Sequence, residues 1–278
     1  REFDRCDQRA GLHIVNQRCA AVPIEPVAVL ADWKPDGLTV WATTQAPHHL
    51  RNNLATWLDV PQTTCRVIAP DVGGGFGSKI VWYPEMFVAP VLSKLLGRPV
   101  KFAQTRSEAM VQMAAGRDQV HDIDVGFDNS GKIKALRLVV SQNLGAYPDP
   151  TGLGLAVLTT WMAAGAYRIP KVEASYRTVT TNTTPVAAYR GAGRPEAAFS
   201  VERIVDVVAK RTGLDPAEVR RRNFIPKSAF PYETHNEAVV YDSADFDAAL
   251  AECLRIIDYD AVRAEQARRR DDPNAKLL

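Results

Sequence analysis

The chain has 278 residues, of which 46% are hydrophobic and 24% are charged, a composition typical of a globular protein with a sizeable core. The formal net charge is only +2 and no basic run is interleaved with aromatic residues, so nucleic acid and anionic membrane surfaces are disfavoured as partners. No apolar run is long enough to span a bilayer, which argues against a membrane span.

The first hundred residues alternate between strand and helix patterns. Residues 37–44 and 64–70 predict strands, and residues 45–58 between them predict a short helix that ends before Pro61. Residues 83–100 predict a second helix, with Pro84 in its first turn and Gly97 as its stop, although Pro90 would disturb its first half. Its apolar residues at helical spacing are Phe87, Val91, Leu92, Leu95 and Leu96.

The middle of the chain predicts a sheet. A short strand at 100–104 is followed by residues 119–127 and 132–142, which flank the turn DNSG and predict an antiparallel hairpin. In the first of these strands, Ile123, Val125 and Phe127 alternate with polar residues, among them His121, so one face is expected to be wet. The stretch from Gly145 to Gly165 is interrupted by glycines, and YRTVTTNT at 176–183 predicts another strand.

The last third of the chain is predicted to be helical. A helix after AAYRGAGRPEAA has a buried stripe and ends at Gly213, and Asp215 caps a second helix with Pro216 at its first position. The stripe consists of Ala197, Val201, Ile204, Val205, Val208 and Ala209. The Pro-rich connection that follows predicts a boundary between a first domain, 1–225, and the linker and incomplete start of a second, 226–278. Residues 244–270 predict further helix, and the terminal DDPNAKLL is typical of an interrupted chain.

The cysteines indicate a reducing compartment. The four of them are scattered and form no C-x-x-C pair, so neither a zinc site nor an iron–sulfur cluster is indicated in this chain. So few cysteines in a chain of this size favour a cytoplasmic location. Because the chain begins with Arg1 and not with Met, the absence of a signal peptide carries little weight, and an N-terminal segment is expected to be missing.

The stretch APDVGGGFGSKI, residues 69–80, places four glycines in five positions directly after a predicted strand. A dinucleotide fingerprint requires G-x-G-x-x-G, but here Ser78 stands where the last glycine belongs. Lys79 follows Ser78, which reverses the order of a nucleotide P-loop. Successive backbone amides can bind an anion, and the alternative is a turn that only allows a helix and a strand to pack closely.

Five motifs occur in order along the chain: NQRCAAVPIEPVAVLADW, VWATTQAPHHLR, APDVGGGFGSK, AYRGAGRPEA and ERIVDVVAKRTGLDPAEVRRRNFIP. Together they resemble the large, molybdopterin-binding subunit of the xanthine dehydrogenase and aldehyde oxidase family of molybdenum hydroxylases, and most closely its carbon monoxide dehydrogenase-like group. The resemblance covers nearly the whole chain. It implies a mixed α/β (α+β) molybdopterin-binding domain, with mixed sheets flanked by helices. The implied cofactor is molybdopterin with Mo, in the cytosine dinucleotide form, and the protein itself supplies no direct metal ligand.

The resemblance assigns cofactor-binding residues one by one. Gln45 matches a glutamine whose amide contacts an oxo ligand of the metal, and two loops match segments whose backbone faces the cofactor. These loop residues are Gly74, Gly75, Phe76 and Gly77, followed by Arg190, Gly191, Ala192 and Gly193. Without the resemblance, three of these residues have ordinary structural interpretations. Gln45 would be a polar residue at the end of a strand, Phe76 an aromatic residue of the core and Arg190 a charged residue on the surface.

Three departures from the family pattern restrict the class of substrate that we expect. Gly191 stands where members that oxidise carbon monoxide carry a copper-binding cysteine, so a copper-bridged centre is not expected. Ile80 replaces a glutamate that meets the purine in xanthine-hydroxylating members, and Ala192 replaces a phenylalanine that stacks on the substrate. Phe76, Ile80 and Ala192 are therefore predicted to line a pocket for an aldehyde or for an N-heterocycle other than xanthine.

The implied reaction is an oxidative hydroxylation with water as the oxygen source. Electrons would pass through the pterin to iron–sulfur clusters and then to FAD, carried by an iron–sulfur subunit and a FAD subunit in a dimer of heterotrimers. The family's base is a glutamate in a G-x-G-E stretch that this chain lacks, so the catalytic residue is unassigned and the remainder of the molybdopterin subunit is expected to supply it. Glu85 and Glu196 are interpreted as carboxylates that stabilise helix N-termini.

Two alternatives stay open. One is a non-catalytic assembly module of such a complex. The other is a flavin- or nicotinamide-binding oxidoreductase, which the glycine spacing disfavours, as does the lack of an acidic ribose contact about 20 residues after the loop.

Overall fold

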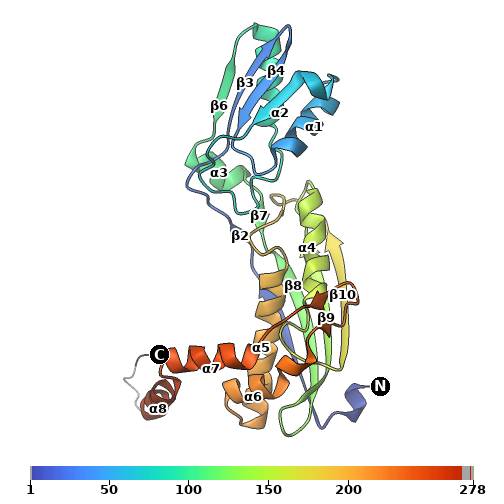
Figure 1. The fold of residues 1–278 in the computed structure, drawn as a ribbon, viewed down its shortest axis with the longest axis vertical. Helices are drawn as coiled ribbons and strands as arrows, with labels where there is room; N and C mark the ends of the chain where they lie inside the picture. Colours follow the sequence, from blue (N-terminus) through green and yellow to red (C-terminus); the bar gives the residue numbers. More distant parts are fainter. Residues whose placement is uncertain (1, 271–275, 277–278) are drawn as a thin grey trace.

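The computed structural model describes residues 2–270 and residue 276, so the expectation for the terminal DDPNAKLL lies outside the described residues except at Lys276. The described chain forms two lobes that are stacked along one long axis and joined at a narrow waist (Figure 1). Each lobe has its own cluster of buried apolar side chains. No helix of the described residues combines the length and apolar character needed to cross a bilayer.

The upper lobe is a four-stranded mixed sheet in the order β5-β4-β3-β6, with helices packed against it. Neighbouring strands are antiparallel except β4 and β5, which run parallel. The elements are β3 (Ala28–Lys34), β4 (Gly37–Ala42), α1 (Pro47–Trp57), η2 (Gln62–Thr64), β5 (Cys65–Ile68), α2 (Glu85–Leu96), β6 (Val100–Ala103) and α3 (Arg106–Gln112). The glycine-rich stretch connects β5 to α2.

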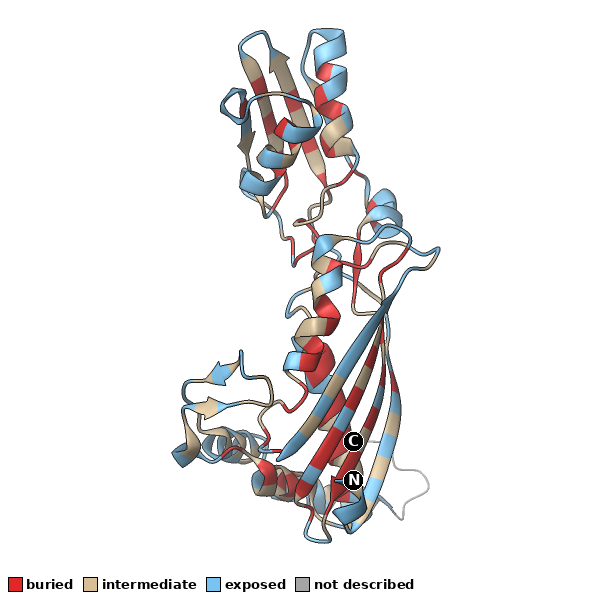
Figure 2. Cartoon of the chain, turned by 90° about the vertical axis from the view of Figure 1, so that its right-hand side faces the viewer, coloured by how far each residue is buried: buried red, intermediate tan, exposed pale blue. Residues whose placement is uncertain are grey.

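The lower lobe is a second four-stranded sheet in the order β1-β8-β9-β10. Its strands are antiparallel except β10, which returns parallel to β9 after the crossover helix α4. The elements are β1 (Gln8–Asn16), β8 (Gln119–Phe127), β9 (Ile133–Asn143), α4 (Pro150–Trp161), β10 (Lys171–Val179) and α5 (Arg194–Thr212). α4 and α5 pack side by side on one face of this sheet, and the buried positions of β8 and β9 point to that side (Figures 1 and 2).

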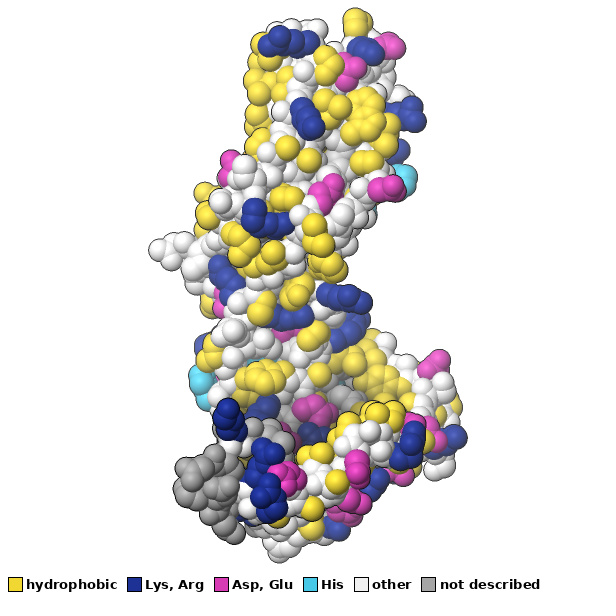
Figure 3. Space-filling view, turned by 90° about the vertical axis from the view of Figure 1, so that its left-hand side faces the viewer, with side chains coloured by type: hydrophobic (Ala, Val, Ile, Leu, Met, Phe, Trp, Pro, Cys, Tyr) yellow, Lys and Arg dark blue, Asp and Glu magenta, His cyan; other side chains and the backbone are white. Residues whose placement is uncertain are grey.

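Short elements complete the waist and the two ends of the chain. At the waist, β2 (Cys19–Ala20) pairs with β7 (Ala115–Gly116). η1 (Phe3–Arg5) begins the described chain, and α7 projects sideways from the lower lobe near the other end (Figure 1). The C-terminal elements are α6 (Pro216–Asn223), η3 (Lys227–Ala229), β11 (Tyr232–Glu233), β12 (Val240–Tyr241), α7 (Phe246–Ile256) and α8 (Tyr259–Arg270). In the space-filling view, hydrophobic side chains are scattered over the upper lobe among lysine and arginine side chains (Figure 3).

The expectations for α5 and α6 are confirmed residue by residue. All six apolar residues of the predicted α5 stripe are buried, and Gly213 ends the helix in the left-handed conformation. The Asp215 carboxylate caps α6 by accepting the N–H of Ala217 at 2.8 Å, with Pro216 at the first helical position.

The predicted helix α2 is confirmed, but most of its apolar residues at helical spacing do not lie on the face that the sheet covers. Val91, Leu92, Leu95 and Leu96 are 40–75% exposed, and the helix buries Met86, Ala89, Pro90 and Ser93. Small residues and a proline on this face allow α2 to lie close to the sheet, where the Ser93 hydroxyl accepts the Trp33 N–H at 2.9 Å. Helical spacing reveals that an apolar stripe exists, but it does not reveal which of two stripes the sheet will cover.

One stretch for which no element was predicted is a helix, and one predicted strand has different bounds. The glycine-interrupted stretch contains the helix α4, which Asp149 caps, with Pro150 at its first position. Gly152 allows the helix to lie against the backbone of Val186, because a side chain at this position would overlap the Val186 carbonyl. The predicted strand at 176–183 instead spans residues 171–179, since its pairing with β9 and not its own composition sets its ends.

His121 lies on the buried face of β8, contrary to the expectation of a wet position. Its ring bonds the Ser200 hydroxyl and the Gln119 side-chain oxygen, and the Gln119 amide bonds Gln142 at 2.6 Å. All four of these side chains are fully buried or nearly so. The sequence pattern could not reveal this network, because its members come from β8, β9 and α5.

This burial predicts that acid destabilises the fold through His121. Burial lowers the pKa of His121 to about 4, whereas a histidine in an unfolded chain titrates near 6.5. Between these values the unfolded state binds a proton that the folded state does not. The free energy of unfolding should therefore fall as the pH falls through this window, by on the order of 1 kcal/mol per pH unit. Denaturant titrations across the window should show a shallower pH dependence for His121→Gln.

The control for this prediction is His13→Gln. The His13 ring lies on the exposed side of β1, where it bonds Asp122 at 2.7 Å and is 63% exposed. This variant should keep the pH slope of the wild type. Equal slopes for wild type and His121→Gln would show that His121 does not cause the acid sensitivity.

Candidate functional site

The first loop, residues 73–79, is held by the side chain of Gln45 just after β4. The Gln45 Oε1 accepts the N–H of Gly77 at 2.9 Å and that of Lys79 at 3.3 Å. The Gln45 backbone N–H donates in turn to the Lys79 carbonyl at 3.0 Å. A side chain at Gly75 would overlap the Gln45 amide, so Gln45 can hold the loop in this way only next to a glycine. The glycine in this position therefore serves packing inside the protein.

A second side chain, Glu25, holds the beginning of the same loop. Its Oε2 accepts the Gly73 N–H at 2.7 Å and the Lys79 ammonium at 2.8 Å, and its backbone N–H bonds the Gly73 carbonyl at 3.2 Å. The Lys79 side chain is fully buried, whereas that of Glu25 is 33% exposed. A buried ammonium requires a paired charge. Sequence reasoning missed this ion pair, because the two residues lie 54 positions apart.

The second loop, residues 189–193, meets the first loop directly. The Arg190 N–H donates to the Phe76 carbonyl at 2.9 Å. Gly77 lies so close to Ala188 that a side chain at Gly77 would overlap the Ala188 carbonyl. The two segments singled out by the sequence therefore converge at the waist, one after β5 of the upper lobe and the other before α5 of the lower lobe.

Both loops place a non-glycine residue in the left-handed region. Phe76 has φ 53° and is followed by Gly77 at 100°, while Ala192 has φ 44° and is followed by Gly193 at 83°. Left-handed backbone is unfavourable for residues with a side chain, and such strain concentrates at functional sites. Left-handed residues next to right-handed ones also turn successive N–H groups into an anion-binding concavity.

Only some of the loop amides lack an acceptor within the described chain, and of these Phe76 and Gly191 are exposed residues whereas Gly75 and Gly193 are buried. Among the described residues, no acceptor bonds the backbone N–H groups of Gly75, Phe76, Gly191 and Gly193. Other expected donors are already used: the Gly77 N–H bonds Gln45, the Gly74 N–H bonds Val72 and the Ala192 N–H bonds Tyr189. The N–H groups of these three residues therefore stabilise the shape of the loops, and the assignment of the loop residues to the cofactor stays a prediction.

Two polar side chains at the loops also have unused donors. Gln45 and Arg190 are exposed, and among residues 2–270 and 276 neither the Gln45 Nε2 nor the Arg190 guanidinium has a hydrogen-bond partner. Phe76 is 40% exposed, so it is not the core aromatic of the alternative interpretation. Ile80 is half-buried and its N–H bonds the Gly77 carbonyl at 3.1 Å.

The two candidate carboxylates lie in first turns of helices, as interpreted. Glu85 begins α2. Glu196 lies in the first turn of α5, is fully buried and forms an ion pair with Arg117 at 3.1 Å. This pairing with Arg117 was not predicted, and a charge already engaged behind the second loop is a poor candidate for a base.

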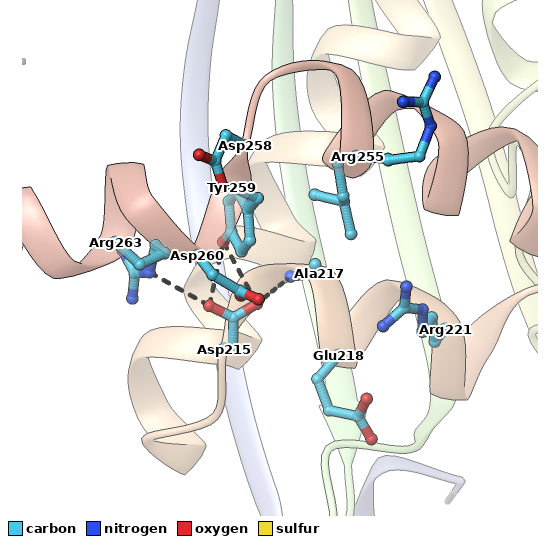
Figure 4. Close-up of a pocket in the computed structure, with 10 residues that line it drawn as sticks. Asp215, Ala217, Glu218, Arg221, Arg255, Asp258, Tyr259, Asp260 and Arg263 are labelled. Atoms are coloured by element: carbon cyan, nitrogen blue, oxygen red, sulfur yellow. Dashed lines mark hydrogen bonds and ion pairs between the residues drawn. The ribbon is translucent and has the colours of Figure 1, made fainter.

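A pocket of about 680 Å³ lies elsewhere, between α6 and the junction of α7 and α8 (Figure 4). The Asp215 carboxylate in it is occupied by the Ala217 N–H, the Tyr259 hydroxyl and Arg263. This pocket belongs to the far end of the lower lobe, away from the waist (Figure 1). The described residues contain no cluster of three or more histidine, cysteine, aspartate or glutamate side chains that could hold a metal ion.

A mixed α/β fold whose two strained loops offer amide donors fits a protein that binds an anionic organic cofactor. Residues 1–224 match the molybdopterin cofactor-binding domain, and the chain belongs to this family of the molybdenum hydroxylases. It is 39% identical over 273 residues to the carbon monoxide dehydrogenase large chain of Hydrogenophaga pseudoflava, covering 96% of this chain and 34% of the relative. It is 33% identical over 261 residues to the nicotine 6-hydroxylase large subunit of Paenarthrobacter nicotinovorans, covering 91% and 31%.

The fold agrees with solved structures of the family. Quinoline 2-oxidoreductase from Pseudomonas putida 86 superposes with a TM-score of 0.91 at 28% identity, over 96% of this chain and 34% of that one. The predicted fold class and family membership are thus confirmed, and the family match sets aside the flavin- or nicotinamide-binding alternative. The chain spans about a third of the length of each of these relatives.

Proposed function

We propose that this chain forms the molybdopterin-binding part of a molybdenum hydroxylase that oxidatively hydroxylates an aldehyde or an N-heterocycle. Water would be the oxygen source. The observation that carries the proposal is the convergence of two strained loops, joined by the Arg190–Phe76 hydrogen bond. Four backbone N–H groups of these loops have no acceptor within the part of the chain that the structure describes. Such a set of donors suits a ligand that is rich in anionic oxygens.

The donors at the waist fit molybdopterin with its metal. The N–H groups of Gly75, Phe76, Gly191 and Gly193 would bind anionic oxygens of the cofactor, and the Gln45 Nε2 would donate to an oxygen of the metal centre. Arg190 would pair with a negative charge of the cofactor. When bound, the cofactor supplies the two-electron redox centre of the reaction. In this proposal Gly74, Gly77 and Ala192 shape the loops without donating their own amides.

The part of the chain described here orients the cofactor and leaves the proton transfer to another segment. Glu196 is paired with Arg117, and neither loop contains a carboxylate. The base would belong to the remainder of the molybdopterin subunit, outside this chain. We therefore expect this polypeptide alone to show no turnover with a dye acceptor.

The substrate pocket and the partners follow from the same proposal. Phe76, Ile80 and Ala192 would line a pocket without the polar contact that a purine needs, and Gly191 would leave no thiolate for copper. The relatives are named as a large chain and a large subunit, which supports a complex of several subunits. We propose that the partners are an iron–sulfur subunit and a FAD subunit, in a cytoplasmic dimer of heterotrimers. The cytosine dinucleotide form of the cofactor also belongs to the proposal.

Metal analysis of the complex that co-purifies with this chain tests the proposal. Molybdenum should be present at close to one atom per chain, and the complex should reduce a dye with members of an aldehyde and N-heterocycle panel. A complex without molybdenum would refute the proposal and favour the assembly-module alternative. A complex that contains molybdenum but acts only on xanthine or carbon monoxide would refute the substrate class alone.

A further inference from the structure

Arg117, which lies between β7 and β8, holds the second loop from behind. Its Nη1 donates to the Tyr189 carbonyl at 3.3 Å, and its Nη2 donates to the Arg190 carbonyl at 2.9 Å. The guanidinium also lies over the Tyr189 ring, 4.6 Å from its centroid. Glu196 fixes the guanidinium by accepting from Nη1 at 3.1 Å, and the two side chains are only 12% and 0% exposed.

Because a peptide group is planar, the hydrogen bonds from Arg117 to the two carbonyls also fix the direction of the N–H groups in the same peptides. In a planar trans peptide, the C=O and the N–H point in opposite directions. The Tyr189 carbonyl points to Arg117, so the N–H on the other side of that peptide, which belongs to Arg190, reaches the Phe76 carbonyl. The Arg190 carbonyl also points to Arg117, so the Gly191 N–H points away from Arg117 and is one of the unengaged donors.

The first loop is built in the same way. The Gly75 carbonyl accepts the Ser78 N–H at 2.9 Å and the Ser78 hydroxyl at 2.8 Å. The N–H on the opposite side of that peptide belongs to Phe76, which is another unengaged donor. In each loop, a buried side chain therefore donates a hydrogen bond to the carbonyl of a peptide whose N–H has no acceptor among the described residues. The side chain is Ser78 in the first loop and Arg117 in the second.

The Arg117–Glu196 pair is not arranged for stability alone. Arg117 itself is left-handed, with φ 66°. The Glu196 Oε2 is buried and has no hydrogen-bond partner within the described residues. A strained backbone and a buried carboxylate oxygen without a hydrogen-bond partner both destabilise a fold. Such features are concentrated at functional sites, where the geometry of the site requires them.

We propose that Arg117 is a positioning residue that aims the Gly191 amide at the cofactor by holding the Tyr189 and Arg190 carbonyls, with Glu196 fixing its guanidinium. The inference rests on the proposed function. It adds a residue that contacts neither cofactor nor substrate but determines how the second loop presents its donor.

The test compares Arg117→Met with the double variant Arg117→Met/Glu196→Gln, in the full subunit within its complex. The single variant leaves a buried carboxylate without its partner, so it should lower the thermal unfolding midpoint. The double variant removes that unpaired charge at nearly constant shape and should recover much of the midpoint. Because the Gly191 amide is still unsupported, the double variant should bind molybdenum and pterin about 10-fold less tightly than wild type. Its remaining Mo(V) should give a shifted electron paramagnetic resonance spectrum.

The matched control is Arg137→Met, which breaks the half-exposed Arg137–Asp124 pair on the other face of the lower sheet and should change none of these readouts. A double variant with the molybdenum content and Mo(V) spectrum of wild type would overturn the inference alone. A double variant that remains as unstable as the single variant would also overturn it, since Arg117 would then act mainly in folding. A wild-type complex without molybdenum would instead refute the proposed function, and the inference with it.

Discussion

Replacing Gly77 with alanine is expected to push the two loops apart and to remove most of the molybdenum from the complex. The new Cβ would overlap the carbonyl of Ala188, which belongs to backbone and cannot rotate away. Gly77 also has φ 100°, where a side chain adds about 1–2 kcal/mol of strain. Relief of the overlap requires the first loop to move, which breaks the hydrogen bond between the Arg190 N–H and the Phe76 carbonyl. Metal analysis and thermal unfolding of the purified complex measure the two effects.

Gly97→Ala separates the strain from the overlap. Gly97 ends α2 with φ 62°, and a side chain added there meets nothing within 4 Å. This control should lose about 1 kcal/mol of stability and keep its molybdenum. If Gly77→Ala also kept a full complement of molybdenum, contact between the loops could not be a requirement for binding the cofactor.

Glu25→Ala is expected to have the second large effect, on the stability of the upper lobe. The substitution leaves the fully buried Lys79 ammonium without its partner and frees the Gly73 N–H. Removing one partner of a buried ion pair destabilises by about 3–5 kcal/mol. We expect the lower end of that range, because the Glu25 side chain is 33% exposed and part of the interaction is already screened by water. Denaturant titration measures the loss of unfolding free energy.

Two further variants show whether the unpaired charge is the cause. Glu25→Gln/Lys79→Met removes both charges at similar shape and keeps an acceptor for Gly73, so it should recover most of the lost stability. Glu252→Ala breaks the exposed Glu252–Arg255 pair and should leave the stability close to that of the wild type, because exposed ion pairs contribute little. A double variant as unstable as Glu25→Ala would mean that lost packing, and not the buried ammonium, accounts for the effect.

The waist places the candidate site where two independently packed lobes meet. Each loop is anchored in its own lobe, the first by Gln45 and Glu25 and the second by Arg117. Between them, one backbone hydrogen bond from Arg190 to Phe76 and the close approach of Gly77 to Ala188 set the distance. A site built in this way depends on both hydrophobic cores, so a stability defect in either lobe is expected to reach the cofactor.

Sequence patterns predicted those helices that have strong local signals. They did not predict which face of an element would be covered by its neighbours. The α5 stripe and the Asp215 cap were confirmed, because period and capping are local properties. The covered face of α2 was not predictable, because it depends on partners that come from other elements. The burial of His121 does follow from the period of two in a strand, since His121 shares the face of Ile123, Val125 and Phe127, and the expectation of a wet position was wrong on this point. The cofactor-binding and substrate-pocket assignments stay predictions, although the loops that carry them do converge.

By itself, the sequence determined the family, the glycine-rich loops and most of the elements that flank them, because motifs, caps and periodicity are written in consecutive residues. Only the tertiary structure decided which loop amides remain available and which side chains hold them in place. Glu25 with Lys79, and Arg117 with Glu196, are separated by 54 and 79 positions, and no local pattern relates such pairs. They form because a charge withdrawn from water requires its partner nearby, and the fold alone brings the partners together.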